Sequence, residues 1–130
     1  MTGYSFTDFS PILLDHFENP RNAGQVDNPD AAGRAGNPAC GDVMELTLRI
    51  TAGVIQEARF RTSGCSAAIA GSSMTTVLLA GRTLDEAEAL TNREVASALG
   101  GLPPAKLHCS VLAEEAVHAA LADYRRRNSL

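Results

Sequence analysis

The stretch from Val43 to Thr62, VMELTLRITAGVIQEARFRT, predicts the centre of the fold. Its first half has the period-two alternation of a strand with one buried face, and the buried positions are Met44, Leu46, Leu48 and Ile50. A turn follows at Thr51-Ala52-Gly53. The second half alternates again, with Ala58 and Phe60 on one side and Arg59 and Arg61 on the other. The stretch therefore predicts an antiparallel hairpin with one face in water.

Helical patterns flank this hairpin. Ser10-Pro11 has the form of an N-cap followed by a first-turn proline, and apolar residues then recur at helical spacing until Asn19-Pro20. The small apolar run SAAIAGSSMTTVLLAG predicts a helix from Ser66 to a stop at Gly81. After Cys109, six apolar positions share one helical face and predict a long C-terminal helix: Leu112, Ala116, Val117, Ala120, Leu121 and Tyr124.

Shorter helices and loops complete the predicted order of elements. Thr83 forms a capping box with Glu86 ahead of a helix that reaches about Leu90, and Asn92 caps another helix, which ends at Gly100-Gly101. The two prolines that follow favour an extended loop. Residues 22–42 are mostly Gly, Pro, Asn, Asp and Ala with almost no large apolar residue, which is typical of a mobile loop.

The composition is that of an ordinary globular protein. The 130 residues are 45% hydrophobic and 20% charged, and tryptophan is absent, so the core must be aliphatic. We therefore expect a single domain over residues 1–130, with a mobile N-terminal segment and loop over about residues 1–42.

Charge and apolar run lengths disfavour two kinds of partner. The formal net charge is -4, and the basic cluster Arg125 to Arg127 is too short and too terminal for a nucleic-acid surface. No apolar run approaches the roughly 20 residues that cross a bilayer, and MTGYSFTDFS lacks the features of a secretory signal. The sequence predicts a cytoplasmic protein that binds neither nucleic acid nor membrane.

The three cysteines lie at the ends of predicted elements. An odd number cannot all pair within one chain, and a reducing compartment disfavours disulfides, so these residues are free thiols, metal ligands or nucleophiles. Cys40 precedes the first predicted strand, Cys65 precedes a helix, and Cys109 follows the proline loop at the start of the last helix. A helix N-terminus lowers the pKa of a thiol, which favours the metal-binding thiolate at Cys65 and Cys109.

Two further candidate ligands neighbour these cysteines. Asp42 follows Cys40 by two residues, and His108 directly precedes Cys109. A carboxylate is a harder and weaker iron ligand than a thiolate, so Asp42 could serve as a replaceable ligand. No close Cys-x-x-Cys pair occurs in the sequence, so folding must assemble the site from distant residues. The other two histidines lie within helical patterns and are interpreted as structural or exposed: His16 and His118.

Blocks along nearly the whole chain resemble one family. They are DHFENPRNAG from Asp15, NPACGDVMEL, ARFRTSGCSAAIAGSS and LPPAKLHCSVLAEEAVHAALADY, in the order and spacing of the U-type iron-sulfur cluster assembly scaffolds (IscU, SufU and the N-terminal domain of NifU). The chain is most similar to the IscU type. The SufU type carries an insertion before its third cysteine and lacks the adjacent histidine, whereas this sequence has a short segment there and the pair His108-Cys109. The NifU type appends further domains, and since this sequence ends at Leu130 we expect a stand-alone scaffold.

The resemblance implies a fold and a site. The implied fold is α+β, a small three-stranded antiparallel sheet with helices packed on it and a long C-terminal helix, although the sequence pattern itself indicates only two strands. Five residues match the scaffold ligands, with Cys109 as the sulfur acceptor: Cys40, Asp42, Cys65, His108 and Cys109.

The resemblance also implies a function, which is that of a scaffold rather than an enzyme. On such a scaffold a transient [2Fe-2S] cluster is built from Fe2+ and from sulfur delivered by a cysteine desulfurase, with a ferredoxin-type electron donor and an iron donor. The cluster then passes to recipient apoproteins. We expect Zn2+ to be able to occupy the same ligands in purified protein, because thiolate and imidazole suit it.

The stretch LPPAK resembles the family motif LPPVK, which an Hsp70-type chaperone recognises together with its co-chaperone. Alanine replaces valine at Ala105, which removes a branched apolar contact. The implied partner-binding residues are Leu102, Pro103, Pro104 and Lys106.

Three alternative functions remain open from the sequence. The foremost is a zinc-dependent sulfurtransferase, a persulfide acceptor of the SufU type, which would share these ligands but keep zinc. A thiol hydrolase would use Cys109, His108 and Asp42, which requires the imidazole within hydrogen-bond reach of the sulfur. A purely structural zinc domain would need the metal in order to fold, and the ample apolar core argues against that need.

Overall fold

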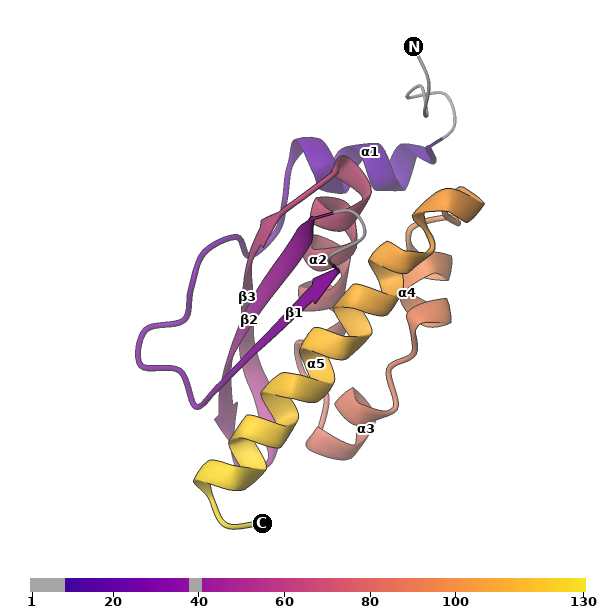
Figure 1. Cartoon of the computed structure of the whole chain (residues 1–130). Helices are drawn as coiled ribbons and strands as arrows, with labels where there is room; N and C mark the ends of the chain where they lie inside the picture. The colour runs from indigo at the N-terminus through magenta and orange to yellow at the C-terminus, as the bar shows by residue number, and fades with distance from the viewer. Residues whose placement is uncertain (1–8, 38–40) are drawn as a thin grey trace.

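The computed structural model describes residues 9–37 and 41–130 (Figure 1). A helix and a three-stranded sheet are followed by a 14-residue helix, two short helices and a long C-terminal helix, with a 3-10 turn before the last. The elements are α1 (Pro11–Glu18), β1 (Ala31–Asn37), β2 (Asp42–Thr51), β3 (Val54–Ser63), α2 (Ser66–Leu79), α3 (Leu84–Glu88), α4 (Asn92–Ala98), η2 (Pro104–Lys106) and α5 (His108–Arg127).

The sheet is antiparallel throughout, in the order β1-β2-β3. Leu46 in β2 lies opposite Gly33 on one side and Phe60 on the other. Helix α5 packs along β1 and β2 and α2 packs on β3, while α1 lies across α2 and the short helices flank α5 (Figure 1). The predicted α+β fold, with its long C-terminal helix, is confirmed.

The core is aliphatic, as the composition requires. Met44, Leu46 and Leu48 are fully buried on the helix-facing side of β2, and Leu13 and Leu112 reach the same core from α1 and α5. Burial of each such side chain contributes about 1.5–3 kcal/mol relative to exposure. The sheet therefore holds its register by this single buried face, because a shift of one residue would turn the buried set toward solvent.

Strand β1 corrects the loop prediction for residues 22–42. Its sequence, AAGRAGN, contains no large apolar residue because α5 lies against it. A Cβ built on Gly33 would lie 2.7 Å from the Ala116 carbonyl oxygen and closer still to the Ala120 amide nitrogen. Only glycine allows that approach, so the strand lacks the β-branched and aromatic residues from which strands are normally recognised.

The outer face of the sheet is also less exposed than the alternation predicted. The segment before β1 crosses this face, where the Val26 amide donates to the Thr47 hydroxyl at 2.9 Å. Both residues are buried, although Thr47 points away from the helices. At the β3 edge, the backbone of Asn22 and Gly24 pairs with Phe60. The sequence of this segment is rich in turn-forming residues, so it gave no sign that the segment packs on the sheet.

Helix boundaries agree with the predictions at most ends. The Ser10 hydroxyl accepts from the Leu13 amide at the start of α1, and Thr83 and Glu86 form the predicted capping box. The cap of α4 is Thr91 rather than Asn92, because the Thr91 hydroxyl accepts from the Glu94 amide.

The proline loop is only partly extended. Pro103 has the extended conformation, but Pro104 to Lys106 form a 3-10 turn that leads into α5. Since α5 begins at His108, His108 and Cys109 are the first residues of a helix rather than the end of a loop. Among the described residues, no helix combines the length and apolar character needed to span a membrane.

The two histidines interpreted as structural have different surroundings. His16 is buried, and its Nδ1 lies 2.8 Å from the Ser73 hydroxyl of α2. His118 is exposed on α5, with Nε2 3.3 Å from the Glu88 carbonyl oxygen. Neither belongs to the candidate site.

Candidate functional site: a cysteine, histidine and aspartate cluster

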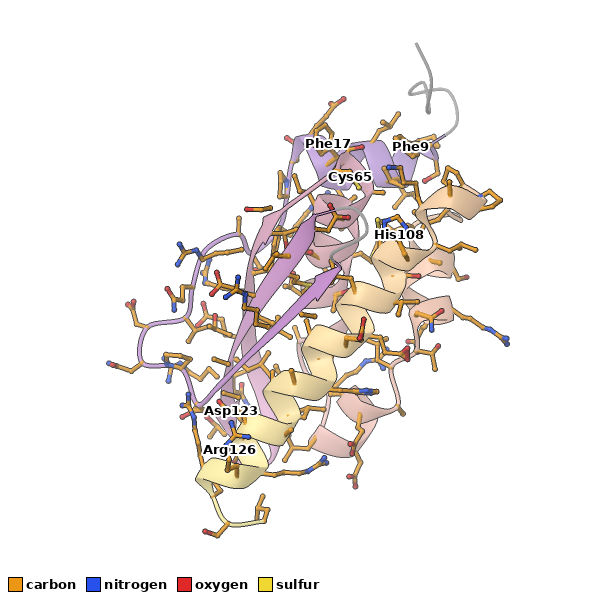
Figure 2. All side chains as sticks on the ribbon, in the orientation of Figure 1. Phe9, Phe17, Cys65, His108, Asp123 and Arg126 are labelled. Carbon is orange, nitrogen blue, oxygen red and sulfur yellow. The ribbon has the colours of Figure 1, made fainter. Side chains whose placement is uncertain are left out.

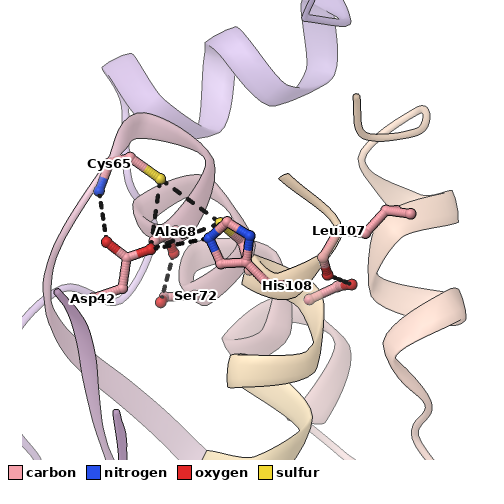
Figure 3. Close-up of polar contacts among 8 residues, drawn as sticks. Asp42, Cys65, Ala68, Ser72, Leu107 and His108 are labelled. Carbon is pink, nitrogen blue, oxygen red and sulfur yellow. Dashed lines mark hydrogen bonds and ion pairs between the residues drawn. The ribbon is translucent and has the colours of Figure 1, made fainter. Parts of the chain in front are cut away.

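The site forms where four elements end at one tip of the molecule. Strand β2 begins at Asp42, β3 ends just before Cys65, α2 begins after Cys65, and α5 begins at His108 (Figures 2 and 3). Because Val43 pairs with Ser63, the strand register sets Asp42 beside Cys65. The packing of α2 and α5 on the sheet then brings Cys109 to the same place.

The two described thiols contact each other and the same carboxylate. The Sγ atoms of Cys65 and Cys109 are 3.7 Å apart. Asp42 Oδ2 lies 3.7 Å from Cys65 Sγ and 3.8 Å from Cys109 Sγ (Figure 3). Residues separated by 23 to 67 positions in the chain thus share one small volume, as the sequence predicted for Asp42, Cys65 and Cys109.

His108 also reaches this cluster, although it neighbours Cys109 on a helix. Its Nε2 lies 3.5 Å from Cys109 Sγ and 3.6 Å from Asp42 Oδ2. Adjacent helical residues point in different directions, but His108 is the first residue of α5 and its long side chain turns back over the thiol. Asp42, His108 and Cys109 together offer ligand atoms within 4.8 Å of one another, a spacing that suits one metal ion.

Asp42 is held by the backbone that carries Cys65. Its side chain is 2% exposed, and the Cys65 amide donates to Oδ1 at 3.2 Å. The carboxylate lies against Gly64, since a Cβ at that position would come within 2.7 Å of Asp42 Cγ. Sequence reasoning missed Gly64 as a site residue. The signal was its place in the Ser63-Gly64-Cys65 junction, where a strand must pass directly into a helix.

The contact between the two thiols shifts their pKa values in opposite directions. A hydrogen bond from the Cys109 thiol stabilises the Cys65 thiolate and lowers the pKa of Cys65 to about 6, against the opposing effect of burial. The same hydrogen bond, together with burial, raises the pKa of Cys109. The direction at Cys65 agrees with the predicted lowering of the pKa, but its cause is the contact with Cys109 rather than the helix N-terminus, and that contact together with burial opposes the predicted lowering at Cys109.

The other predicted residues are Cys40 and those of the LPPAK segment. Cys40 lies outside the described residues. Leu102 packs with Ala67 and Ala68 against Cys109, so the first residue of LPPAK supports the site from its apolar side. Pro103, Pro104 and Lys106 are half-buried or exposed, and the structure does not test their predicted role in partner binding.

The ligand set combines soft and hard donors. Thiolates and imidazole suit zinc and iron, whereas a carboxylate is a harder ligand that these metals bind more weakly beside sulfur. The site lies at element ends rather than inside the core, and Cys65 and His108 are only half-buried. The fold and this site define a small α+β protein with a solvent-accessible cluster of side chains that could hold a metal ion.

Sequence comparison identifies the family. The profile described as "NifU-like N terminal domain" matches residues 8–130, and the chain belongs to this family. It is 50% identical over 123 residues to the iron-sulfur cluster assembly scaffold protein IscU of Escherichia coli (strain K12), covering 92% of this chain and 95% of that protein. It is 49% identical over 126 residues to IscU of Azotobacter vinelandii, covering 94% of this chain and 98% of that protein.

Solved structures agree with the fold. FiSufU from Fervidobacterium Islandicum AW-1 superposes with a TM-score of 0.74 at 18% identity, covering 91% of this chain and 99% of that one. The N-terminal part of a NifU-like protein from Brucella abortus superposes with a TM-score of 0.61 at 21% identity, covering 92% of this chain and 86% of that one.

Proposed function

We propose that this protein is a scaffold on which iron-sulfur clusters are assembled and from which they are released to other proteins. The observation that carries the proposal is the convergence of Cys65, Cys109, Asp42 and His108 from three chain segments on one volume. Its IscU relatives are named as cluster assembly scaffolds and not as enzymes, and they match nearly the whole chain.

The finer proposal concerns the cargo, a [2Fe-2S] cluster built from Fe2+. Its ligands would be the three cysteines with Asp42 or His108 in the remaining position. A cluster held by fewer than four thiolates is released more easily than one in a permanent four-cysteine site. The half-exposed Cys65 and His108 favour release further, because solvent and a recipient protein reach them without unfolding the core.

Sulfur would arrive as persulfide from a cysteine desulfurase and reside on Cys109. Electrons and iron would come from a ferredoxin-type donor and an iron donor, and the cluster would leave for recipient apoproteins in the cytoplasm. An Hsp70-type chaperone with its co-chaperone would bind at LPPAK. The half-buried Leu102 links that segment to Cys109, so binding there would act directly on the site.

Anaerobic reconstitution tests the proposal. Metal-free protein is incubated with Fe2+, cysteine and a cysteine desulfurase, and absorption and Mössbauer spectra are recorded. A brown product with [2Fe-2S] spectra, which apo-ferredoxin then takes up, is the expected result. Cys109→Ser should abolish formation of the brown product, because it removes the sulfur acceptor. Cys65→Ser is the comparison, because it removes a cluster ligand and leaves the sulfur acceptor in place.

The zinc-dependent sulfurtransferase predicts a different outcome of the same experiment. In that case the protein would keep tightly bound zinc, remain colourless and pass persulfide sulfur onward. No contact among the described residues favours that function over the scaffold. A colourless, zinc-retaining product would overturn the scaffold proposal.

A further inference from the structure

The thiols of Cys65 and Cys109 are in direct contact, with no atom between them. Their Sγ atoms are 3.7 Å apart, close to the contact distance of two sulfur atoms. A disulfide requires about 2 Å between its sulfurs, so a small side-chain movement separates contact from a bond. This pair can therefore do redox chemistry that neither thiol could do alone.

The two thiols differ in their access to solvent. Cys109 is 2% exposed, whereas Cys65 is half-buried at the junction between β3 and α2. Cys109 packs against Ala67, Ala68 and Leu102, which hold its sulfur in the apolar lining. Cys65 Sγ is thus a second sulfur within reach of Cys109, placed at the outer side of the site.

We propose that Cys65 is a resolving thiol, which attacks a persulfide on Cys109 and releases its outer sulfur as sulfide. The inference rests on the proposed function, in which Cys109 receives persulfide sulfur. Cys65 Sγ attacks Cys109 Sγ, the bond from Cys109 Sγ to the outer sulfur breaks, and a Cys65–Cys109 disulfide forms. The outer sulfur leaves as hydrogen sulfide, keeping its own hydrogen and taking the one that the Cys65 thiol gives up.

The electrons balance within the protein. The outer sulfur of the persulfide goes from oxidation state -1 to -2 as it becomes sulfide, the Cys65 sulfur goes from -2 to -1, and the Cys109 sulfur stays at -1 in the disulfide. No external reductant is needed to release the first sulfide. The electron donor then reduces a protein disulfide, which restores both thiols as cluster ligands.

Geometry selects the sulfur that is attacked. The atom at 3.7 Å from Cys65 Sγ is Cys109 Sγ, which is the inner sulfur of the persulfide. Attack on the outer sulfur would instead move the persulfide to Cys65 and release no sulfide. These two reactions give different products, so experiment can distinguish them.

The test uses metal-free, full-length protein without oxygen. Desulfurase and cysteine load the protein, rapid gel filtration removes free cysteine and desulfurase, and bromobimane traps the released sulfide over time. Intact and peptide mass spectrometry follow the cysteines. The wild type should release one sulfide for each persulfide on Cys109, while the mass of the added sulfur is replaced by a Cys65–Cys109 disulfide.

Matched variants decide the role of Cys65. Cys65→Ser should take up sulfur on Cys109 but keep it, with sulfide release lost, and Cys65→Ala should behave in the same way if serine perturbs folding. His118→Gln, an exposed change on α5 outside the site, is the control and should release sulfide as the wild type does, and Cys40→Ser tests whether the third cysteine resolves the persulfide instead. Release that depends on Cys40, or a persulfide recovered on Cys65, would overturn the inference.

Failure of the inference differs from failure of the proposed function. Persulfide that persists on Cys109 of the wild type would overturn the resolving role and leave the scaffold function intact. Absence of sulfur uptake at Cys109 would overturn the acceptor role in the proposed function, and the resolving role with it.

Discussion

Asp42 is the one carboxylate in contact with both described thiols, and its strength as a ligand sets the predicted lifetime of the cargo. We predict that Asp42→Ala gives a longer-lived bound cluster, because removing a hard, weakly held donor leaves the softer ligands to retain the iron. The rate of absorbance loss after anaerobic reconstitution measures this. Asp27→Ala, on the loop before β1, is a control that should not change the rate.

Gly64 matters because it has no side chain. In Gly64→Ala the new Cβ would overlap the buried Asp42 carboxylate, so the mutation should cost about 1–3 kcal/mol of unfolding free energy, as overpacking usually does. Urea denaturation measures the cost.

A double-mutant cycle identifies the clash as the cause. In an Asp42→Ala background the clashing carboxylate is gone, so Gly64→Ala should be much cheaper. An equal cost in both backgrounds would show that the effect comes from the backbone at Gly64 and not from Asp42.

At the scale of elements, the packing of β1 against α5 rests on one glycine. We predict that Gly33→Ala destabilises the protein by about 1–3 kcal/mol or more, since its Cβ would meet the α5 backbone at Ala116 and Ala120, which cannot turn aside as a side chain can. The shift of the urea midpoint tests this.

Gly36→Ala is the matched control within the same strand. The nearest atoms to a Cβ there, in Asp42 and Val43, lie at 3.8 Å, which is ordinary contact. The control should leave the midpoint nearly unchanged. Equal effects of the two substitutions would mean that strand propensity, and not contact with α5, decides the cost.

Elements with a pattern of their own could be predicted, and elements defined by their neighbours could not. The hairpin of β2 and β3 and the long α5 carry their burial pattern in sequence, so periodicity identifies them. Apart from Arg34 and Asn37, β1 consists of alanine and glycine, and at Gly33 the close approach of α5 leaves no room for a side chain. Its existence followed only from the family resemblance.

The site could be predicted to a similar extent. The residue types and element ends around Asp42, Cys65 and Cys109 indicated a metal site before the fold was known. The contacts that individual side chains make within the site could not be predicted from the sequence. The pattern placed the start of the last helix after Cys109, whereas α5 begins two residues earlier at His108, and the raised pKa of Cys109 follows from its contact with Cys65.

At the scale of the whole molecule, a buried histidine links stability to pH. The Ser73 hydroxyl accepts from the Arg21 amide and shares a 2.8 Å hydrogen bond with His16 Nδ1. Burial, followed by the charge of Arg21, lowers the pKa of His16 below its usual 6.5, against the opposing charge of Asp15. The network joins α1 to α2.

The sign of the pH dependence follows from this lowered pKa. Above pH 6.5 the imidazole is neutral in both states and the contribution of His16 is fully present. As the pH falls below that value, the unfolded chain binds the proton first, so stability is lost until the pH reaches the lowered pKa of the folded state.

We predict that the unfolding free energy falls between pH 7 and 5, and that His16→Gln flattens this slope, because glutamine can accept the Ser73 hydrogen bond without titrating. Urea denaturation at several pH values measures the slope. His118→Gln is the exposed control and should keep the wild-type profile. An unchanged profile in His16→Gln would assign the slope to other groups.

The ends of β2, β3, α2 and α5 lie together at one tip of the molecule, and this limits where partner proteins can bind. Cys65 and His108 open at that tip, while the C-terminal end of α5, with Asp123 and Arg126, lies at the opposite pole (Figure 2). Under the proposed function, a protein that delivers sulfur to Cys109 and a protein that receives the cluster would both have to bind at this tip. Binding of the sulfur donor and binding of the recipient protein would then be mutually exclusive, and their competition would set the order of assembly and release.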